Sequence, residues 1–400
     1  MFRQVSDHSS KVKKDLHLLL IIGGLYALAT FLSNTFVNIF IWKKSGEYID
    51  IATYNLAIYI LQPISFYFAG KCAKKVDRVL ILRLGILILS LFYIFVLILG
   101  DYVTTIPYVA GALLGVGYGF YWLSFNVLTF EITEPDTRDY FNGILGALQS
   151  FGGMVGPLFA GYIISILDNF TGYTYIFLVS FILFILAVII SFYLQRRKAT
   201  GRFSIRFVQN ERRKNKSWRT ILHSHIAQGM REGLFIFIIA IWVYVESNSE
   251  FALGIFNLLF SFSSFISYFF ISKLIKQSNR KIMIFIGGLL LYLAVAIFVF
   301  HTNYITLLVY GVIVGLSYPI FNVPFVSLTY DVIGTSRRAR EYRIEYIVMR
   351  ELFINMGRIV AIVCFIIGTV LFQESIIAIL ILFFGAGNLA AGVIIKRGME

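Results

Sequence analysis

The 400-residue sequence is poor in cysteine and histidine, and both shortages exclude classes of protein. Its only cysteines, Cys72 and Cys364, cannot form the disulfide framework of a small secreted domain. Its five histidines are scattered, and the His223–Ser–His225 pair has no acidic or cysteine cluster to complete a metal site. No glycine-rich loop with its lysine is present to cradle a nucleotide. The sequence therefore does not indicate an enzyme, and it predicts neither a metal nor another cofactor.

Long polar stretches are also scarce, because 58% of the residues are hydrophobic and the mean hydropathy is +0.81. A helix that crosses the hydrocarbon core of a bilayer needs roughly 20 apolar residues. The chain contains twelve such runs, at about 16–42, 49–70, 79–99, 105–128, 143–167, 172–194, 221–245, 251–272, 282–300, 304–329, 344–370 and 375–395. The sequence therefore predicts an all-α polytopic membrane protein with twelve transmembrane helices.

Acidic residues are few as well, 21 against 35 lysines and arginines, and the net charge is +14. A basic chain can bind nucleic acid, so the distribution of its charges has to be considered. With the amino terminus inside, thirty Lys and Arg residues fall in inner segments, whereas the outer loops hold only Lys43 and Lys44. This is the positive-inside pattern of membrane proteins. We therefore expect both termini in the cytoplasm, a cell-membrane location in the lipid bilayer, and no nucleic-acid partner.

The chain repeats itself at an offset of about two hundred positions. The stretch 111–131 returns as 311–331 with six identical residues among the twenty-one pairs, and 70–78 returns as 272–280. The only long polar connection, 195–220, holds ten basic residues and one acid. We therefore expect an amino-terminal six-helix bundle over 1–194, a cytoplasmic basic linker over 195–220 and a carboxyl-terminal six-helix bundle over 221–400. Two similar halves that rock against each other are the usual plan of a secondary transporter.

Twelve segments in a six-plus-six repeat, inside termini and a basic middle loop together resemble a major facilitator superfamily transporter over essentially the full length. The family carries a loop signature between its second and third helices, roughly G-x-x-x-D-R-x-G-R. Here Gly70, Lys75 and Arg78 match in type, but Lys74 replaces the aspartate and Asp77 replaces a glycine. In the family this loop helps to latch the cytoplasmic side. The resemblance therefore makes Lys74, Asp77 and Arg78 candidates for an inner gate.

Loop charges give a second inner-gate hypothesis. The loop after the fourth segment is acidic and begins at Glu131, whereas the loop after the tenth is basic and includes Arg337 and Arg338. Opposite charges on the two halves predict a latch, and a solvated surface is the alternative.

The fifth segment resembles the G-x-x-x-G-P-x-x-G-G signature of proton-coupled antiporters in this family, with Ala160 in place of one glycine. Small residues four positions apart let a neighbouring helix approach closely, and a proline weakens the backbone at a bend. The resemblance implies export, and ordinary helix packing is the alternative. The residues of the motif are Gly152, Gly153, Gly156, Pro157 and Gly161.

Charged residues inside the apolar runs are the sharpest local signal, because each costs ~2.5–3.5 kcal/mol at a helix centre on insertion scales. Segment seven contains Arg231 and Glu232, and segment eleven contains Arg350, Glu351 and Arg358, which is the extra positive charge. One hypothesis makes Glu232 or Glu351 a proton carrier, with Arg231 or Arg358 as its switch or as an anion-binding group. The alternative is a permanent network of ion pairs between the two segments.

Polar residues at helical spacing predict a substrate cavity. Amides and phenols beside aromatic rings suit a moderately polar or amphipathic ligand, and hydrogen bonding between helices is the alternative. The residues are Tyr26, Thr30, Asn34 and Asn38 in segment one, Tyr118, Trp122 and Asn126 in segment four, Tyr318 and Asn322 in segment ten, with Gln228 and Asn355.

From these patterns we expect a monomeric secondary transporter that couples proton entry to export of a small amphipathic compound. A flippase for a lipid-like or lipid-linked substrate is one alternative. A membrane sensor or scaffold that does not transport is another.

Overall fold

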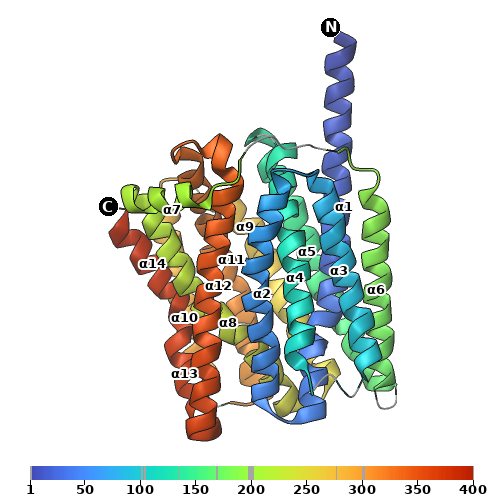
Figure 1. Ribbon diagram of the computed structural model, residues 1–400. Helices are drawn as coiled ribbons and strands as arrows, with labels where there is room; N and C mark the ends of the chain where they lie inside the picture. Colours follow the sequence, from blue (N-terminus) through green and yellow to red (C-terminus); the bar gives the residue numbers. More distant parts are fainter. Residues whose placement is uncertain are drawn as a thin grey trace.

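The computed structural model consists of long helices, and no strand occurs among the residues that it describes (Figure 1). The backbone is described except at 1, 101, 103–104, 134, 168–169, 197–201, 276, 300–301 and 400, and the side chains of 2–13, 135–140, 142–143, 272–274, 296 and 298–299 are not described either. The helices are α1 (Phe2–Ser45), α2 (Tyr48–Ala73), α3 (Arg78–Leu99), α4 (Pro107–Ile132), α5 (Pro135–Ile166), α6 (Thr171–Ser191), α7 (Ile205–Lys214), α8 (Lys216–Ser247), α9 (Glu250–Leu274), α10 (Arg280–Val299), α11 (Tyr304–Thr335), α12 (Ala339–Phe372), a 3-10 turn (Gln373–Ile376), α13 (Ile377–Gly385) and α14 (Gly387–Gly398).

Each of the twelve predicted apolar runs lies on these helices. The first six lie on α1 to α6, the next five on α8 to α12, and the last on α13 and α14 together. Among the described residues, ten helical stretches are long and apolar enough to cross a membrane, and one of them, Ala339–Gly398, contains the last two runs. The prediction of an all-α polytopic membrane protein is confirmed.

Local capping explains where several helices begin. Asp77, which stands where the family signature has glycine, accepts a hydrogen bond from the backbone N–H of Val79 and so caps α3. Asn215 caps α8 in the same way, and Asn303 forms a capping box with Thr306 at the start of α11. Side-chain oxygens at these positions satisfy N–H groups that have no partner inside the helix. The short α7 lies across one end of the bundle, where α1 begins and α14 ends (Figure 1).

The two bundles, α1–α6 and α8–α14, repeat the same contact at the end of the molecule where α7 lies. Arg78 Nη1 at the start of α3 lies 2.6 Å from Glu131 Oε1 at the end of α4. Arg280 at the start of α10 pairs in the same way with Asp331 near the end of α11. Both ion pairs join equivalent positions of the sequence repeat, so the internal similarity extends to side-chain contacts.

Glycines bring the backbones of α8 and α12 into direct contact. A Cβ atom at Gly229 would lie 2.0 Å from the carbonyl oxygen of Ile354, and one at Gly357 would lie 2.1 Å from that of Ile226. No side chain fits at either position, because real Cβ atoms do not approach backbone oxygens so closely. This close packing of small residues holds the middle of α8 against the middle of α12.

We expect Gly357→Val to prevent this packing and to lower the yield of folded protein about tenfold, because overpacking forces backbone shifts that cost several kcal/mol. Gly146→Val in α5 is the matched control, since a Cβ there meets nothing within 4 Å. Size-exclusion chromatography of detergent-solubilised protein measures the folded fraction. Equal yields of the two variants would contradict the predicted contact.

Candidate functional site

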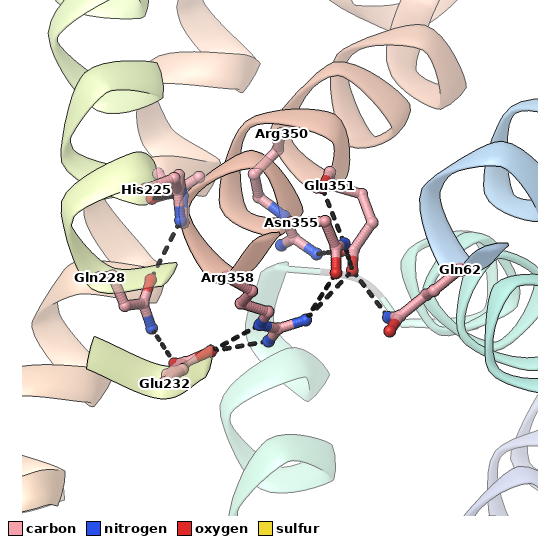
Figure 2. Close-up of polar contacts among 9 residues, drawn as sticks. Gln62, His225, Gln228, Glu232, Arg350, Glu351, Asn355 and Arg358 are labelled. Atoms are coloured by element: carbon pink, nitrogen blue, oxygen red, sulfur yellow. Dashed lines mark hydrogen bonds and ion pairs between the residues drawn. The ribbon is translucent and has the colours of Figure 1, made fainter. Parts of the chain in front are cut away.

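An ion pair between α8 and α12 lies at the centre of the polar cluster (Figure 2). Arg358 donates to Glu232 Oε2 from Nη2 at 2.6 Å and from Nε at 3.2 Å. Gln228, one turn before Glu232 on α8, donates to the other carboxylate oxygen at 2.8 Å. The side chains of Glu232 and Arg358 remain 20% and 17% exposed. The pair is therefore well bonded and partly exposed.

A second carboxylate, Glu351 of α12, receives donors from both bundles. Its Oε1 accepts hydrogen bonds from Asn355 Nδ2 at 3.0 Å and from Gln62 Nε2 of α2 at 2.9 Å. Arg350 Nη2 lies 3.6 Å from Glu351 Oε2, and Arg358 Nη1 lies 3.9 Å from Oε1. Arg358 thus reaches both carboxylates, and Glu351 connects this network to the amino-terminal bundle (Figure 2).

Three members of this network were not predicted from the sequence. Gln62 lies next to Pro63 inside an apolar run, and this isolated polar residue was the available signal. Tyr59, one turn earlier on α2, places its ring 4.9 Å from the guanidinium of Arg358. His225 is buried and its Nδ1 lies 3.1 Å from Gln228 Oε1, so it extends the network along α8 toward the amino-terminal end of that helix (Figure 2).

The extra positive charge of the cluster is Arg231 rather than Arg358. Arg358 is held by Glu232, whereas Arg231 has no ion-pair partner among the described residues. Arg231 Nη2 donates to the hydroxyl of Tyr310 at 3.4 Å, and its guanidinium lies 4.6 Å from the ring of Phe235. The two residues of the Arg231–Glu232 dipeptide therefore point to different partners, as their 100° separation around a helix requires.

The predicted polar stripes are divided among several contacts. Tyr26 is buried, stacks on Tyr121 with ring centroids 3.9 Å apart and meets Trp122 edge-on at 5.2 Å. Asn38 Oδ1 accepts from Asn55 at 2.8 Å, and Asn322 donates to the hydroxyl of Tyr268 at 3.4 Å. Hydrogen bonds between helices therefore account for two of the predicted amides. The remaining stripe residues are partly buried, namely Thr30, Asn34, Tyr118, Asn126 and Tyr318.

The glycine motif of α5 lies between the two bundles. Added Cβ atoms at Gly152 and Gly156 would approach the backbone of α1, at 3.3 Å and 3.0 Å. One at Gly153 would lie 2.6 Å from Ser261 Oγ of α9, and one at Gly161 would lie 2.4 Å from the carbonyl oxygen of Glu250. The motif, which includes Pro157, therefore lets α5 pack tightly on α1 within its bundle and on α9 in the other bundle.

Among the described residues, one ion pair joins the two bundles at each end of the molecule. At the end where α7 lies, Lys74 Nζ after α2 lies 3.3 Å from Glu345 Oε2 of α12, and the two side chains are 7% and 0% exposed. Ser204, just before α7, donates its backbone N–H to Glu345 Oε1 at 3.1 Å. At the opposite end, Lys43 of α1 lies 2.7 Å from Glu250 Oε1 at the start of α9. Lys74, the residue that reverses the charge of the family signature, therefore has a buried acidic partner.

The loop-charge latch remains a prediction. Glu131 is bonded to Arg78 in its own bundle, and Arg338 pairs with Glu341 three residues further on at 2.6 Å. Arg337 is exposed. The side chains of 134–140, on which the hypothesis also depends, lie outside the described residues. Among the described residues no cluster of His, Cys, Asp and Glu has the geometry of a metal site.

Comparison with known proteins identifies the family. The model of the Major Facilitator Superfamily matches residues 19–342, and the chain belongs to this superfamily. It is 55% identical over 365 residues to the uncharacterized protein YqgE of Bacillus subtilis (strain 168), an alignment that covers 91% of this chain and 85% of that protein. It is 56% identical over 177 residues to an uncharacterized protein in the sodM 3' region of Geobacillus stearothermophilus, covering 44% of this chain and 83% of that protein.

Solved transporters share the fold at low sequence identity. A POT family transporter in complex with 5-aminolevulinic acid aligns with a TM-score of 0.75 at 12% identity, covering 96% of both chains. The human organic anion transporter MFSD10 (TETRAN) aligns with a TM-score of 0.73 at 11% identity, covering 96% of this chain and 99% of that one. The protein is thus a multi-pass membrane transporter for a small-molecule substrate, and its family is not enzymatic.

Proposed function

We propose that the protein is a monomeric, proton-coupled secondary transporter that exports a small amphipathic compound across the cell membrane, with both termini in the cytoplasm. Its moving units are the bundles 1–194 and 221–400, joined by the linker 195–220. One observation carries the proton coupling: Arg358 lies 2.6 Å from Glu232 and 3.9 Å from Glu351, and Glu351 is bonded to Gln62 of the other bundle. A single guanidinium is therefore shared between a partly exposed carboxylate and a carboxylate that joins the bundles.

Protonation of Glu232 removes the negative charge that holds Arg358. The guanidinium is then attracted to Glu351, because opposite charges interact strongly where water is scarce. Closer approach of Arg358 to Glu351 competes with the amide of Gln62 for the same carboxylate oxygen. Proton binding on α8 thereby weakens a contact between the bundles, which is the coupling that alternating access requires.

The two terminal ion pairs are the proposed gates. Lys43–Glu250 holds one face closed and Lys74–Glu345 holds the other. Alternating access requires one of them to open while the other stays formed. The direction of export is supported by the antiporter-like glycine motif of α5, which packs on α9 across the bundle boundary.

Reconstituted protein with an entrapped pH-sensitive dye tests the proposal. A panel of amphipathic drugs and metabolites is added to proteoliposomes, and a transported compound is expected to drive a proton flux about tenfold above empty liposomes. Counterflow of the same compound without a gradient then distinguishes transport from a sensor or scaffold. A compound that shows counterflow but moves no protons would contradict proton coupling, and the proposal of transport would still stand.

A lipid-like substrate is the second candidate, and a groove between α1 and α5 supports it. This groove has a volume of about 440 Å³ and is lined almost entirely by apolar side chains, among them Ile21, Leu28, Leu148 and Phe151. Ile21 and Phe151 are 48% and 58% exposed, so the groove is open at the surface. An acyl chain fits such a lining, whereas a polar drug does not. Scrambling of fluorescent lipids in the same proteoliposomes would favour this function over drug export.

A further inference from the structure

A chain of three hydrogen bonds runs from Glu232 to α11. Gln228 donates from Nε2 to Glu232 Oε1 at 2.8 Å, and its own Oε1 lies 3.1 Å from His225 Nδ1. His225 Nε2 lies 3.3 Å from Thr329 Oγ1 of α11. The three α8 members follow one another along that helix (Figure 2). The imidazole, the amide and the hydroxyl belong to residues that are at most 5% exposed, so their polar atoms need partners inside the protein.

The ionised form of Glu232 fixes the direction of every bond in this chain. A carboxylate only accepts hydrogen bonds, so Gln228 turns its amide nitrogen toward Glu232 and its oxygen toward the ring of His225. That oxygen needs a donor, so the ring carries its proton on Nδ1. Nε2 of a neutral ring is then an acceptor, and the hydroxyl of Thr329 has to donate to it. The same hydroxyl lies 2.9 Å from the carbonyl oxygen of Phe325, so two acceptors compete for its one proton.

Protonation of Glu232 allows the same chain to form in the opposite direction. The carboxyl O–H donates to Gln228 once the amide has turned over, and the amide nitrogen then donates to Nδ1 of His225. The ring carries its proton on Nε2 and donates it to Thr329. The hydroxyl of Thr329 now donates to the carbonyl oxygen of Phe325 without competition. Each buried group therefore has a partner in both states.

The surroundings of the His225 ring favour its neutral form in both states. Arg350 and Arg358 of α12 are the positive charges that act on the ring. From α11 the ring meets Phe325 edge-on, with ring centroids 4.7 Å apart, and an uncharged hydroxyl. A third positive charge beside two guanidinium groups is unfavourable in a buried site. The ring therefore responds by moving its proton from one nitrogen to the other, and it does not become charged.

Glu232 is the group of this chain that changes its charge with pH. It faces the guanidinium of Arg358 on α12, and it interacts with the phenols of Tyr59 on α2 and Tyr318 on α11. The guanidinium stays charged and the phenols are neutral at the pH of the cell. Any change along the chain therefore begins at the Glu232 carboxylate.

We propose that His225 is a positioning residue whose tautomer follows the protonation of Glu232, with the amide of Gln228 as the reversing link between them. This inference rests on the proposed proton coupling. The ring gains a proton at Nε2 and gives up the one at Nδ1 by exchange with water, so it carries one proton before and after. The net uptake is the single proton on Glu232. Because no buried donor or acceptor is left unpaired, Glu232 changes its charge without that penalty in either direction.

Nitrogen-15 NMR of the purified full-length protein, labelled in histidine, tests the proposal, because it distinguishes a ring nitrogen that carries a proton from one that does not. We expect His225 to carry its proton on Nδ1 at high pH and on Nε2 at low pH, and to stay neutral throughout. Its signals are those that disappear in His225→Asn. His223 on the same helix is exposed and is the control, which should become positively charged as the pH falls. A His225 ring that keeps one tautomer, or that becomes charged, would overturn the proposal.

Glu232→Gln separates a response to Glu232 from a general effect of pH. Residue 232 cannot titrate in this variant, so the tautomer of His225 should be the same at every pH. A pH-dependent tautomer that persists would show that another group drives it and would overturn the proposal. Proton flux in proteoliposomes tests the coupling separately. A tautomer that follows pH in a wild type without proton flux would contradict the proposed function and support the chain, whereas flux with a fixed tautomer would do the reverse.

Thr329→Val and Thr329→Ser provide an independent test if His225→Asn does not fold. Valine has nearly the shape of threonine but no hydroxyl, so the proton on Nε2 loses its acceptor, whereas serine keeps the hydroxyl. We expect proton flux to fall about tenfold in Thr329→Val and to stay within about twofold of the wild type in Thr329→Ser, with counterflow unchanged in both. Equal proton flux in the two variants would show that the hydroxyl takes no part and would overturn the proposal.

Discussion

Replacing Glu232 by glutamine is expected to reduce proton-driven transport at least 100-fold while leaving counterflow within about threefold of the wild type. Glutamine keeps the size of the side chain and can still accept from Arg358, but it cannot bind or release a proton. A 100-fold loss of rate corresponds to about 2.7 kcal/mol. Removing one charge of an ion pair in a poorly hydrated site can cost this much. The proton flux reported by an entrapped dye and the counterflow of the same compound measure the two activities separately.

The control for this experiment lies on the same helix. Glu246 is exposed near the carboxyl-terminal end of α8, so Glu246→Gln removes a carboxylate without touching the network. It is expected to retain both activities. Glu351→Gln is expected to slow counterflow as well as proton flux, because Glu351 also bonds to Gln62 across the bundles. Normal proton-driven transport by Glu232→Gln would remove Glu232 from the mechanism and leave the ion pair a purely structural role.

The fold could be predicted from the sequence because a bilayer imposes a simple rule. Every spanning segment must be apolar and long enough to satisfy its own backbone, so the twelve runs are visible in composition alone. The division of the last run at Ala386 was missed, since two glycines in an apolar run are common in membrane helices. At this position the start of α14 packs closely against α8, and the local sequence does not report such a tertiary contact.

The partners of the charged residues could be predicted only in part. Helical spacing placed Glu351, Asn355 and Arg358 on one face, and the structure joins Asn355 to both neighbours. Spacing within one helix carries no information about Gln62, because that contact depends on how two bundles meet. For the same reason the sequence did not show which arginine of the cluster lacks a carboxylate.

Exchanging the charges of Lys74 and Glu345 tests the proposed inner gate. We expect a large effect on the balance between the closed and inward-open states. Lys74→Glu places two carboxylates together in a buried site, and Glu345→Lys does the same with two ammonium groups. Breaking a buried pair in this way costs about 3–5 kcal/mol, so either single variant should favour the inward-open state more than about tenfold. The double variant restores an ion pair with its ends exchanged and should return most of the closed population.

The rate at which a buried cysteine is labelled measures the population of the inward-open state. Val348 of α12 is 0% exposed and lies against Gly70, at the end of the interface that holds Lys74 and Glu345. Val348→Cys, with the native cysteines replaced, should therefore become reactive only when the proposed gate opens. The control is Arg338→Glu, which breaks an ion pair whose side chains are 52% and 48% exposed and should change the labelling rate less than about twofold.

The double variant decides between a gate and a general loss of stability. If Lys74 and Glu345 only stabilise the fold, then the single variants lower the Tm and speed labelling together, and any rescue affects both equally. If they form the inner gate, labelling from the inside accelerates while the outer pair Lys43–Glu250 becomes harder to break, because alternating access opens one face only when the other is closed. Only a gate predicts opposite changes in the same single variant. The cysteine at the inner face should be labelled faster than in the wild type, and a cysteine at the outer face should be labelled more slowly.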